Sequence, residues 1–352
     1  MELPLTRAVL DAGLAGRAFP GAAVEVGRTA GALWQHAAGR LRYEPEATAC
    51  SIDTVFDLAS LTKVIATASS AMRLNESGAL DLDAPVSRYL PAWADAAHAP
   101  IRIRQLLDHS SGLPAHERLW ERARGRAEFE SEIHACTLDR PIGSSAVYSD
   151  LGFMTLGFVL ENLAQAPLDR QMRDLASVIG ARTLGYLPDA SWREHIAPTE
   201  FDPWRDRLLI GEVHDENASA LGGVAGHAGL FGSVGDVGAF ARAVLRTFSG
   251  AASPLGRAAT MRTFAARSAT PGSSRALGWD TMLPTSSCGR RMSASAIGHT
   301  GFTGTSLWID PEQDLYVAFL SNRVYPTRNN EGIRAVRPRL HDAVVEDLDS
   351  GA

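Results

Sequence analysis

Residues 58–74 read LASLTKVIATASSAMRL, a stretch of helical length in which almost every side chain is small or apolar. A helix without a polar face is buried on all sides, so this segment predicts an interior helix. Asp57 precedes it and is a candidate N-cap. Ser60 and Lys63 stand three residues apart near its start. This spacing places them on one face, where the lysine amine can hydrogen-bond the serine hydroxyl.

The chain has 34 basic residues. All of them are arginine except Lys63, which is the only lysine. Arginine replaces lysine wherever only a positive charge is needed, but a guanidinium does not release its proton and an amine does. A serine hydroxyl becomes a strong nucleophile when a neighbouring base takes its proton. The pair therefore predicts a nucleophile, Ser60, beside a base, Lys63. The positive start of the helix and the Ser60 amide would face a developing oxyanion.

Segments with the alternation typical of strands occur near the two ends of the chain. They cover residues 22–26, 33–38, 277–282, 305–310 and 315–321, with a hairpin loop at 311–314. Helical patterns cover residues 4–16, 236–247 and 331–348, and Pro338 should bend the last one. Residues 81–225 show short helical patterns broken by Pro, Gly and Ser. We expect an α/β (α+β) fold, in which one antiparallel sheet built from both ends is flanked by the terminal helices.

The helical middle of the chain is then an inserted lobe. Residues 1–57 and 226–352 together are expected to form the sheet domain, and residues 58–225 a mostly helical domain. Because Ser60 and Lys63 stand at the first boundary, we expect the active site at the interface of the two domains.

Composition excludes several classes of protein. The 352 residues carry 34 basic and 40 acidic side chains, a formal charge of −6, so a nucleic-acid partner is not expected. Cys50, Cys136 and Cys288 form neither a CxxC pair nor an even set, which argues against a disulfide framework or a thiolate zinc site. The sequence shows no signal-peptide pattern and no apolar run of membrane-spanning length, so we expect a cytoplasmic protein without a membrane partner.

Two other patterns have ordinary interpretations. His214-Asp215-Glu216-Asn217 suggests a metal site, but no second histidine at helical spacing completes it, so we expect a loop and no metal. The glycine-rich segment 222–229 does not have the spacing of a nucleotide-binding loop, and we expect it to let the chain pass closely beneath the site. No cofactor is expected. The chain also lacks a Gly-x-Ser-x-Gly elbow, which disfavours an α/β-hydrolase.

Three further stretches accompany the Ser60-x-x-Lys63 pair. They are IRIRQLLDHSSGLP at 101–114, Tyr148-Ser149-Asp150, and His299-Thr300-Gly301. In this order, over residues 18–345, the four motifs resemble those of the serine β-lactamases and penicillin-binding DD-peptidases, particularly the class C β-lactamase branch with its esterase relatives. The resemblance implies a β-lactamase/transpeptidase-like fold and an acyl-enzyme mechanism.

The resemblance also implies roles for single residues. Ser60 would attack a carbonyl, Lys63 with Tyr148 would carry its proton to the leaving group, and the amides of Ser60 and Phe302 would form the oxyanion hole. The remaining residues implied to bind substrate are Asp150, His299, Thr300 and Gly301.

Two positions depart from the family pattern. Asp150 stands where an asparagine is usual, and an acid there could pair with Lys63 and keep it charged. His299 stands where a lysine is usual, which weakens the fixed positive charge for a substrate carboxylate. We therefore expect a serine hydrolase acting on a small-molecule ester or amide, with carboxylesterase or β-lactamase-like activity. The alternatives are a DD-peptidase or D-amino-acid peptidase, a penicillin-binding protein that acylates without turnover, and a Schiff-base enzyme using Lys63. The oligomeric state stays open.

Overall fold

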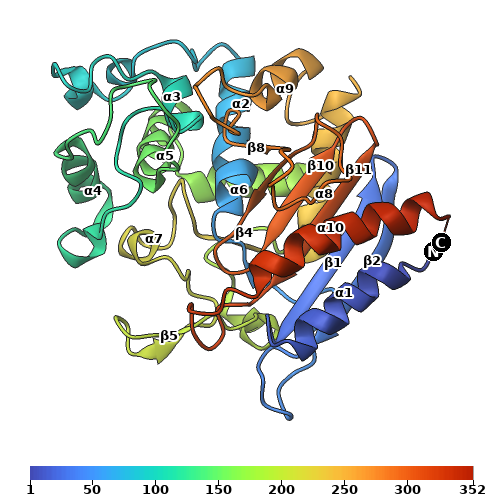
Figure 1. Cartoon of the computed structure of the whole chain (residues 1–352). Helices are drawn as coiled ribbons and strands as arrows, with labels where there is room; N and C mark the ends of the chain where they lie inside the picture. The colour runs from blue at the N-terminus through green and yellow to red at the C-terminus, as the bar shows by residue number, and fades with distance from the viewer. Residues whose placement is uncertain (352) are drawn as a thin grey trace.

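The computed structural model describes residues 1–351 and is built around one six-stranded antiparallel sheet (Figure 1). The order of the strands is β2-β1-β11-β10-β9-β8. Strand β1 pairs with β11 so that Ala22 lies opposite Ser321, which joins the two ends of the chain in the centre of the sheet. The strands are β1 (Gly21–Arg28), β2 (Gly31–Gly39), β8 (Asp280–Thr281), β9 (Ile297–Thr300), β10 (Ser306–Asp310) and β11 (Leu315–Ser321).

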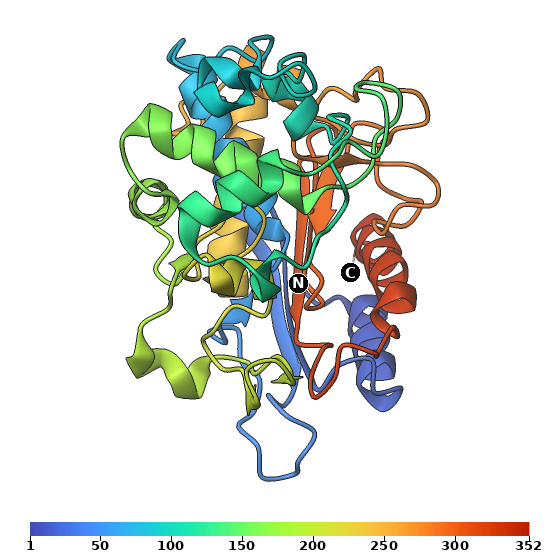
Figure 2. The same cartoon turned by 90° about the vertical axis from the view of Figure 1, so that its left-hand side faces the viewer.

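Both faces of the sheet are covered by helices. In β11 every residue is buried, and alternate side chains enter different cores. Val317 and Phe319 pack with the terminal helices α1 (Pro4–Ala15) and α10 (Ile333–Asp349). Ala318 and Leu320 pack with α8 (Val234–Phe248) and the helical lobe. Figure 2 shows α1 and α10 on one side of the sheet and the other helices on the opposite side.

The middle of the chain is mostly helical, with short strands between the helices. Its helices are η1 (Lys63–Ala68, a π-helix), α2 (Ser69–Glu76), η2 (Val86–Arg88), η3 (Pro91–Ala94), α3 (Ile103–Leu107), η4 (Leu119–Glu121), α4 (Gly125–His134), α5 (Asp150–Ala164), α6 (Leu168–Ile179), η5 (Ala190–His195) and α7 (Glu216–Ala220), and α9 (Ala258–Ala265) follows α8. Two small sheets join β3 (Phe56–Asp57), β7 (Leu230–Gly232) and β4 (Gly185–Tyr186), and β5 (Phe201–Asp202) and β6 (Arg207–Leu208).

The predicted fold class is confirmed, and most predicted elements lie within a few residues of the observed ones. Two local predictions were wrong, and one strand was missed. Asp57 is not an N-cap, because it lies in β3 and the helical segment begins at Leu61. The strand predicted at 277–282 is reduced to β8, because Gly278 turns the chain at φ +90°. Strand β9, which ends with His299 and Thr300, was not predicted.

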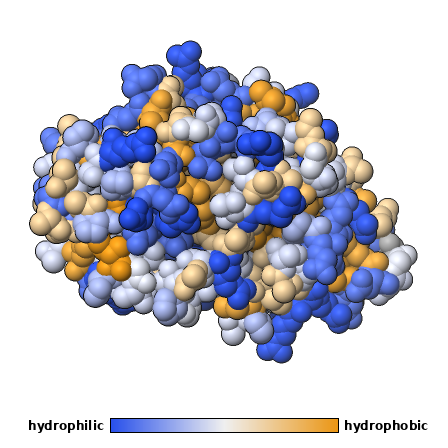
Figure 3. All heavy atoms as spheres, turned by 90° about the horizontal axis from the view of Figure 1, so that it is seen from above, coloured by the Kyte–Doolittle hydropathy of each residue, from blue (hydrophilic) through white to orange (hydrophobic). Residues whose placement is uncertain are grey.

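One apolar core joins the sheet to the helical lobe. It includes Leu320 of β11, Val237 of α8, Ile65 of η1 and Leu156 of α5. The boundaries at residues 57/58 and 225/226 stay a prediction. At the surface, apolar side chains form small separate groups among polar ones on the face seen in Figure 3. Within residues 1–351, no helix combines the length and the apolar character needed to cross a membrane.

Candidate active site

A sharp turn between β3 and the buried helix presents Ser60. Ala59 has φ +47°, a left-handed conformation that an alanine adopts only when its surroundings enforce it. The Asp57 carboxylate accepts the Ala59 amide at 2.8 Å, and the Ala59 carbonyl accepts the hydroxyl of Thr62 at 2.6 Å. These bonds fix the turn, so Ser60 stands at the entrance of the helix.

Lys63 lies directly behind Ser60 and is completely buried. Its Nζ donates to Ser60 Oγ at 3.2 Å, to Asp150 Oδ1 at 2.7 Å and to the carbonyl of His227 at 3.2 Å. Burial is the largest single influence and would lower the pKa of Lys63, but the charge of Asp150, the electrostatic influence of Tyr148 and hydrogen bonding to both residues together outweigh it and raise that pKa above its ordinary value. In the same pair, burial would raise the pKa of Asp150, but the charge of Lys63, hydrogen bonding to His116 and Lys63 and the charge of His227 together outweigh it and lower that pKa. The resting pair is therefore an ammonium and a carboxylate.

Tyr148 comes from the loop before α5 and covers this pair. Lys63 Nζ lies 4.6 Å from the centre of its ring. Burial raises the pKa of the Tyr148 phenol, and the charge of Lys63 together with hydrogen bonding to Lys63 and Ser60 offsets this only in part. Tyr148 is therefore a neutral phenol in the resting site, and it lines the pocket together with Ser60.

His299 lies beside Tyr148, with 5.7 Å between the ring centres. Its Nδ1 donates to the carbonyl of Thr300 at 2.9 Å, so Nε2 carries the lone pair. Nε2 is buried and has no partner among the described residues. Burial, with the nearby charges of Arg275 and Lys63, lowers the pKa of His299 well below its usual value. His299 is therefore neutral and does not supply the positive charge of the lysine usual at this position.

The end of β9 is docked against the turn that carries Ser60. A Cβ on Gly301 would lie 2.6 Å from the carbonyl oxygen of Leu58 and 2.0 Å from Thr305 Oγ1, so only glycine fits this close approach. Thr305 Oγ1 also donates to the Leu58 carbonyl at 3.0 Å. From α10, the buried Arg337 donates to the carbonyl of Gly301 at 2.7 Å. This network fixes the amide of the following residue, Phe302, relative to Ser60.

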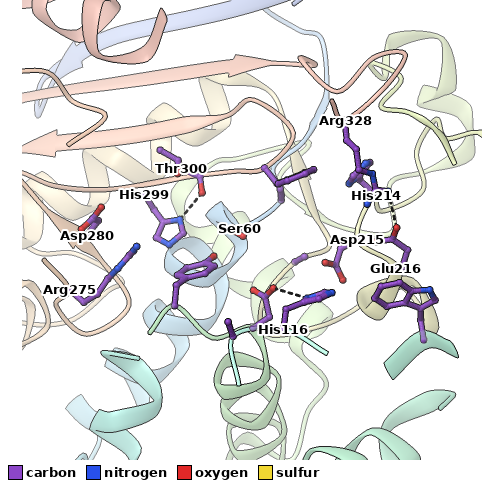
Figure 4. A pocket seen from close by; sticks show the side chains of 17 residues that line it. Ser60, His116, His214, Asp215, Glu216, Arg275, Asp280, His299, Thr300 and Arg328 are labelled. Atoms are coloured by element: carbon purple, nitrogen blue, oxygen red, sulfur yellow. Dashed lines mark hydrogen bonds and ion pairs between the residues drawn. The ribbon is translucent and has the colours of Figure 1, made fainter. Parts of the chain in front are cut away.

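A pocket of about 630 Å³ opens at Ser60 (Figure 4). It brings together six of the eight residues predicted for the site. Lys63 lies behind the wall, and Gly301 packs in the strand end described above. The predicted residues that line the pocket are Ser60, Tyr148, Asp150, His299, Thr300 and Phe302.

Sequence reasoning missed several residues of the pocket wall. His116 Nδ1 lies 3.5 Å from Asp150 Oδ2, and hydrogen bonding to this carboxylate raises the pKa of His116. Arg275 also faces the pocket, with its guanidinium carbon 5.1 Å from the centre of the Tyr148 ring. Both residues stand on loops, and no local spacing in the sequence connects them to Ser60.

The two arginines of the pocket differ in their partners. Arg328 is neutralised by Glu200 at 2.6 Å and Glu216 at 2.8 Å. Arg275 forms no ion pair with any residue in the described part of the chain. In Figure 4, Arg275 and Asp280 lie on one side of Ser60, and Arg328 and Glu216 lie on the other. Arg275 is therefore the cation that the pocket offers to a ligand.

The segment that suggested a metal site has structural contacts. The amide of His214 donates to Asp57 Oδ2 at 2.6 Å, and its Nε2 lies 2.9 Å from Glu200. Asp215 caps α7 by accepting the amide of Ala218 at 2.7 Å. These contacts anchor the loop that forms one wall of the pocket.

The glycine-rich segment passes beneath the site, as predicted. A Cβ on Gly226 would lie 2.1 Å from the carbonyl oxygen of Phe153 in α5. The Gly226 carbonyl accepts Thr67 Oγ1 at 2.6 Å, and the next carbonyl accepts Lys63 Nζ. The glycine-rich segment therefore provides a hydrogen-bond acceptor for Lys63 itself.

Comparisons with known proteins agree with this geometry. Residues 6–340 match the family model described as Beta-lactamase. A curated protein of Escherichia coli K12 named "Putative D-alanyl-D-alanine carboxypeptidase" is 32% identical over 308 residues, which cover 77% of this chain and 69% of the relative. The "N-acetylmuramyl-L-alanine amidase" of Bacillus subtilis 168 is 34% identical over 301 residues, which cover 77% of this chain and 68% of the relative.

Solved structures share the fold over nearly the whole chain. EstCE1, described as a hydrolase with promiscuous acyltransferase activity, has a TM-score of 0.76 at 23% identity and covers 97% of this chain and 98% of its own. A beta-lactamase from Sulfitobacter sp. EE-36 has a TM-score of 0.80 at 22% identity, with 99% and 98% covered. The match to the family model and the curated relatives above 30% identity lead to one conclusion: the chain belongs to the beta-lactamase family.

Proposed function

We propose that this protein is a serine hydrolase that cleaves an ester or an amide through an acyl-enzyme on Ser60. The observation that carries the proposal is the contact of Ser60 Oγ with Lys63 Nζ at 3.2 Å, under Tyr148 and at the floor of an open pocket. The family supports hydrolysis, and in this proposal Ser60 is the nucleophile, Lys63 its charged partner and Tyr148 the proton carrier.

The pKa directions assign different tasks to the two partners of Ser60. Lys63 is an ammonium at rest, so it stabilises negative charge and does not act as the base. As Ser60 Oγ bonds to the substrate carbonyl carbon, its proton passes to the Tyr148 oxygen, and the Tyr148 proton passes to the leaving nitrogen or oxygen. The bond to the leaving group breaks, the amine or alcohol departs, and an ester to Ser60 remains.

Water completes the reaction by the same route. Its oxygen attacks the acyl carbon, its proton passes through Tyr148 to Ser60 Oγ, and the carboxylic acid leaves. In both steps the carbonyl oxygen becomes negative, and we assign its stabilisation to the amides of Ser60 and Phe302. Neither amide donates a hydrogen bond to another group within residues 1–351, so both are available to a substrate.

The unpaired cation of the pocket suggests the substrate class. Arg275 lies beside Tyr148, on the side of the pocket where the leaving group is protonated in this mechanism. A guanidinium binds a carboxylate in a planar, two-pronged contact. We therefore propose an acyl substrate that carries a carboxylate near the scissile bond. The curated carboxypeptidase relatives point to a peptide ending in D-alanine as one such compound.

The test compares wild type, Ser60→Ala and Ser77→Ala, an exposed serine outside the pocket, on three substrates: p-nitrophenyl butyrate, nitrocefin and a D-alanyl-D-alanine peptide. Ser60→Ala should lose about 10³-fold or more in turnover of every substrate that wild type cleaves, and Ser77→Ala should lose none. Intact-mass spectra should show an acyl adduct on wild type only. An adduct without turnover would support the penicillin-binding alternative, and full activity of Ser60→Ala would refute the proposal.

The substrate class is tested with Arg275→Gln in the same panel. The variant should raise KM about tenfold or more for nitrocefin and the peptide, which carry a carboxylate, and leave KM for the uncharged ester unchanged. If Arg275→Gln changed KM equally for charged and uncharged substrates, the proposed substrate class would be wrong. The proposed nucleophile would not be affected by this result, because Ser60→Ala tests the nucleophile separately.

A further inference from the structure

A second cluster of titratable side chains lies outside the pocket, in the helical lobe. Asp95 and His98 belong to the loop after η3, and His134 is the last residue of α4. His98 Nδ1 lies 3.0 Å from both oxygens of Asp95, and His134 Nε2 lies 2.7 Å from Asp95 Oδ2. The ligand atoms of all three side chains lie within 4.8 Å of one another. None of the three lines the pocket at Ser60.

The orientation of His98 is that of a metal ligand. Its side chain is only 7% exposed, and its Nε2 lies 3.4 Å from the carbonyl oxygen of Cys136. A carbonyl only accepts hydrogen bonds, so Nε2 carries the proton in this contact. The lone pair of a neutral His98 is then on Nδ1, which faces the carboxylate. Histidines that bind metals commonly donate their other ring nitrogen to a carbonyl in this way.

A lone pair that faces a carboxylate is unfavourable unless a proton or a cation lies between the two acceptors. The Asp95 oxygens are acceptors only, so a neutral His98 in this orientation would place two acceptors 3.0 Å apart. Either a proton on Nδ1 or a cation resolves the conflict.

We propose that Asp95, His98 and His134 bind a divalent cation of the zinc class. Two imidazoles and a carboxylate are ligands typical of Zn²⁺, and water would occupy the fourth position. Tetrahedral coordination with bonds of about 2.0–2.1 Å needs ligand atoms about 3.3 Å apart, so the ring nitrogens of His98 and His134 would move away from Asp95 by about 0.3 Å and about 0.6 Å. The partial exposure of Asp95 and His134, 39% and 32% of their side chains, gives the ion and its water access.

The bound ion would connect two parts of the lobe. The loop at 95–98 and the end of α4 are separated by more than thirty residues, and the ion would hold them with three bonds. The ring of Trp93 packs against both histidines, at 5.2 Å from His98 and 6.0 Å from His134. This packing limits the rotation of both rings and preorganises the site. Because folding would form the site, the ion should stabilise the folded protein by mass action.

The test titrates the chelator-treated full chain with Zn²⁺ by calorimetry and with Co²⁺ by visible absorption, which reports tetrahedral coordination. Wild type should bind one equivalent with a Kd of about 10 µM or tighter, and Zn²⁺ should raise its Tm. Asp95→Asn and His134→Gln should each weaken binding at least about tenfold and abolish the shift in Tm. Asn retains an oxygen for the amides of Ala97 and His98, which Asp95 Oδ1 accepts, so this variant preserves the loop.

His195→Gln is the matched control, because His195 is exposed and lies outside the cluster. It should bind Zn²⁺ as wild type does. No binding by wild type up to about 100 µM Zn²⁺ would refute the proposal and leave a proton as the bridge between His98 and Asp95. Unchanged binding by His134→Gln would refute it too, because the ion would then be held elsewhere on the chain.

Discussion

At the scale of single residues, Asp150 decides the charge of the catalytic centre. It contacts Lys63 at 2.7 Å and His116 at 3.5 Å, so one carboxylate faces two bases. An asparagine at this position would leave burial as the main influence on Lys63, and burial favours the neutral amine. The acid therefore changes which group in the site is able to accept a proton.

The first prediction concerns the titration of Lys63 in Asp150→Asn. Because Lys63 is the only lysine, a chain labelled with ¹³C-lysine gives one lysine signal in NMR spectra, and its shift reports protonation. In wild type the pKa of Lys63 is raised, so the ammonium should persist to a higher pH than in free lysine. In Asp150→Asn the main cause of the increase is gone and burial, the largest influence, remains, so the midpoint should fall below that of free lysine.

The control for this titration is Asp174→Asn, which removes an exposed carboxylate of α6 and should leave the signal as in wild type.

The directions of the two pKa shifts also determine how the stability of the fold depends on pH. A raised pKa of Lys63 stabilises the folded state below the unfolded pKa, and this stability is lost as the pH rises through the folded pKa. The lowered pKa of Asp150 adds stability above about pH 4 that is lost in acid. If Asp150→Asn left the midpoint of the Lys63 titration unchanged, this would contradict the assignment of Asp150 as the group that keeps Lys63 charged.

Residues with a local signal were found from the sequence, and residues placed by loops were not. Ser60 and Lys63 share one helix face at a spacing of three, which the sequence displays directly. Arg275 and His116 reach the pocket only after the chain has folded, because distant loops bring them there. Because His299 stands where the family usually has a lysine, the sequence indicated the loss of a positive charge. Only the structure shows that Arg275 lies close to this position.

At the scale of elements, the end of β9 and the turn before the buried helix act as one unit. Their contact depends on Gly301 and on the hydroxyls of Thr303 and Thr305, which donate to the carbonyls of Asp57 and Leu58. A strand that carries one proposed oxyanion donor is thus fixed to the turn that carries the other. Small displacements of this contact should affect the reaction more than the fold.

The second prediction is that Gly301→Ala impairs catalysis. The added methyl group would collide with the Leu58 carbonyl and Thr305 Oγ1, so β9 must move away from Ser60. We expect a loss of about 1–3 kcal/mol in the free energy of unfolding and a decrease of at least tenfold in kcat. Gly185→Ala in β4 is the control, because a Cβ there meets open space. Equal kcat values for the two variants and wild type would show that the position of β9 does not matter.

Strands could be predicted from the sequence only where apolar residues alternate along them. The pattern at 315–321 predicted β11 at its observed bounds, because its alternating apolar side chains enter two cores. Strand β9 has the sequence Ile-Gly-His-Thr, whose small and polar residues serve the site and give no strand signal. The π-helical turn of η1 likewise has no local signal in a segment that reads as an ordinary helix.

At the scale of the whole molecule, a buried polar network ties α8 to the sheet. Glu25 of β1 is 1% exposed, and it accepts Tyr316 of β11 at 2.6 Å and Arg242 of α8 at 2.7 Å. The carboxylate is thus held in the layer between sheet and helices by one phenol, one guanidinium and the side-chain amide of Gln35. The same layer belongs to the apolar core that continues into the helical lobe. The sequence predicted two domains, but it contains no signal for a core shared between them, because such a core depends on which faces meet.

The third prediction is that the sheet and the helical lobe unfold together. Urea unfolding followed by far-UV circular dichroism and by tryptophan fluorescence should give one coincident transition, because no apolar boundary separates the two parts. Arg242→Met leaves Glu25 buried without its cation and should cost about 3 kcal/mol, moving both curves by the same amount. Arg246→Met, an exposed position one turn along α8, should move neither curve. Two separate transitions, of which Arg242→Met shifts only one, would instead show that the sheet domain and the helical domain are independent folding units.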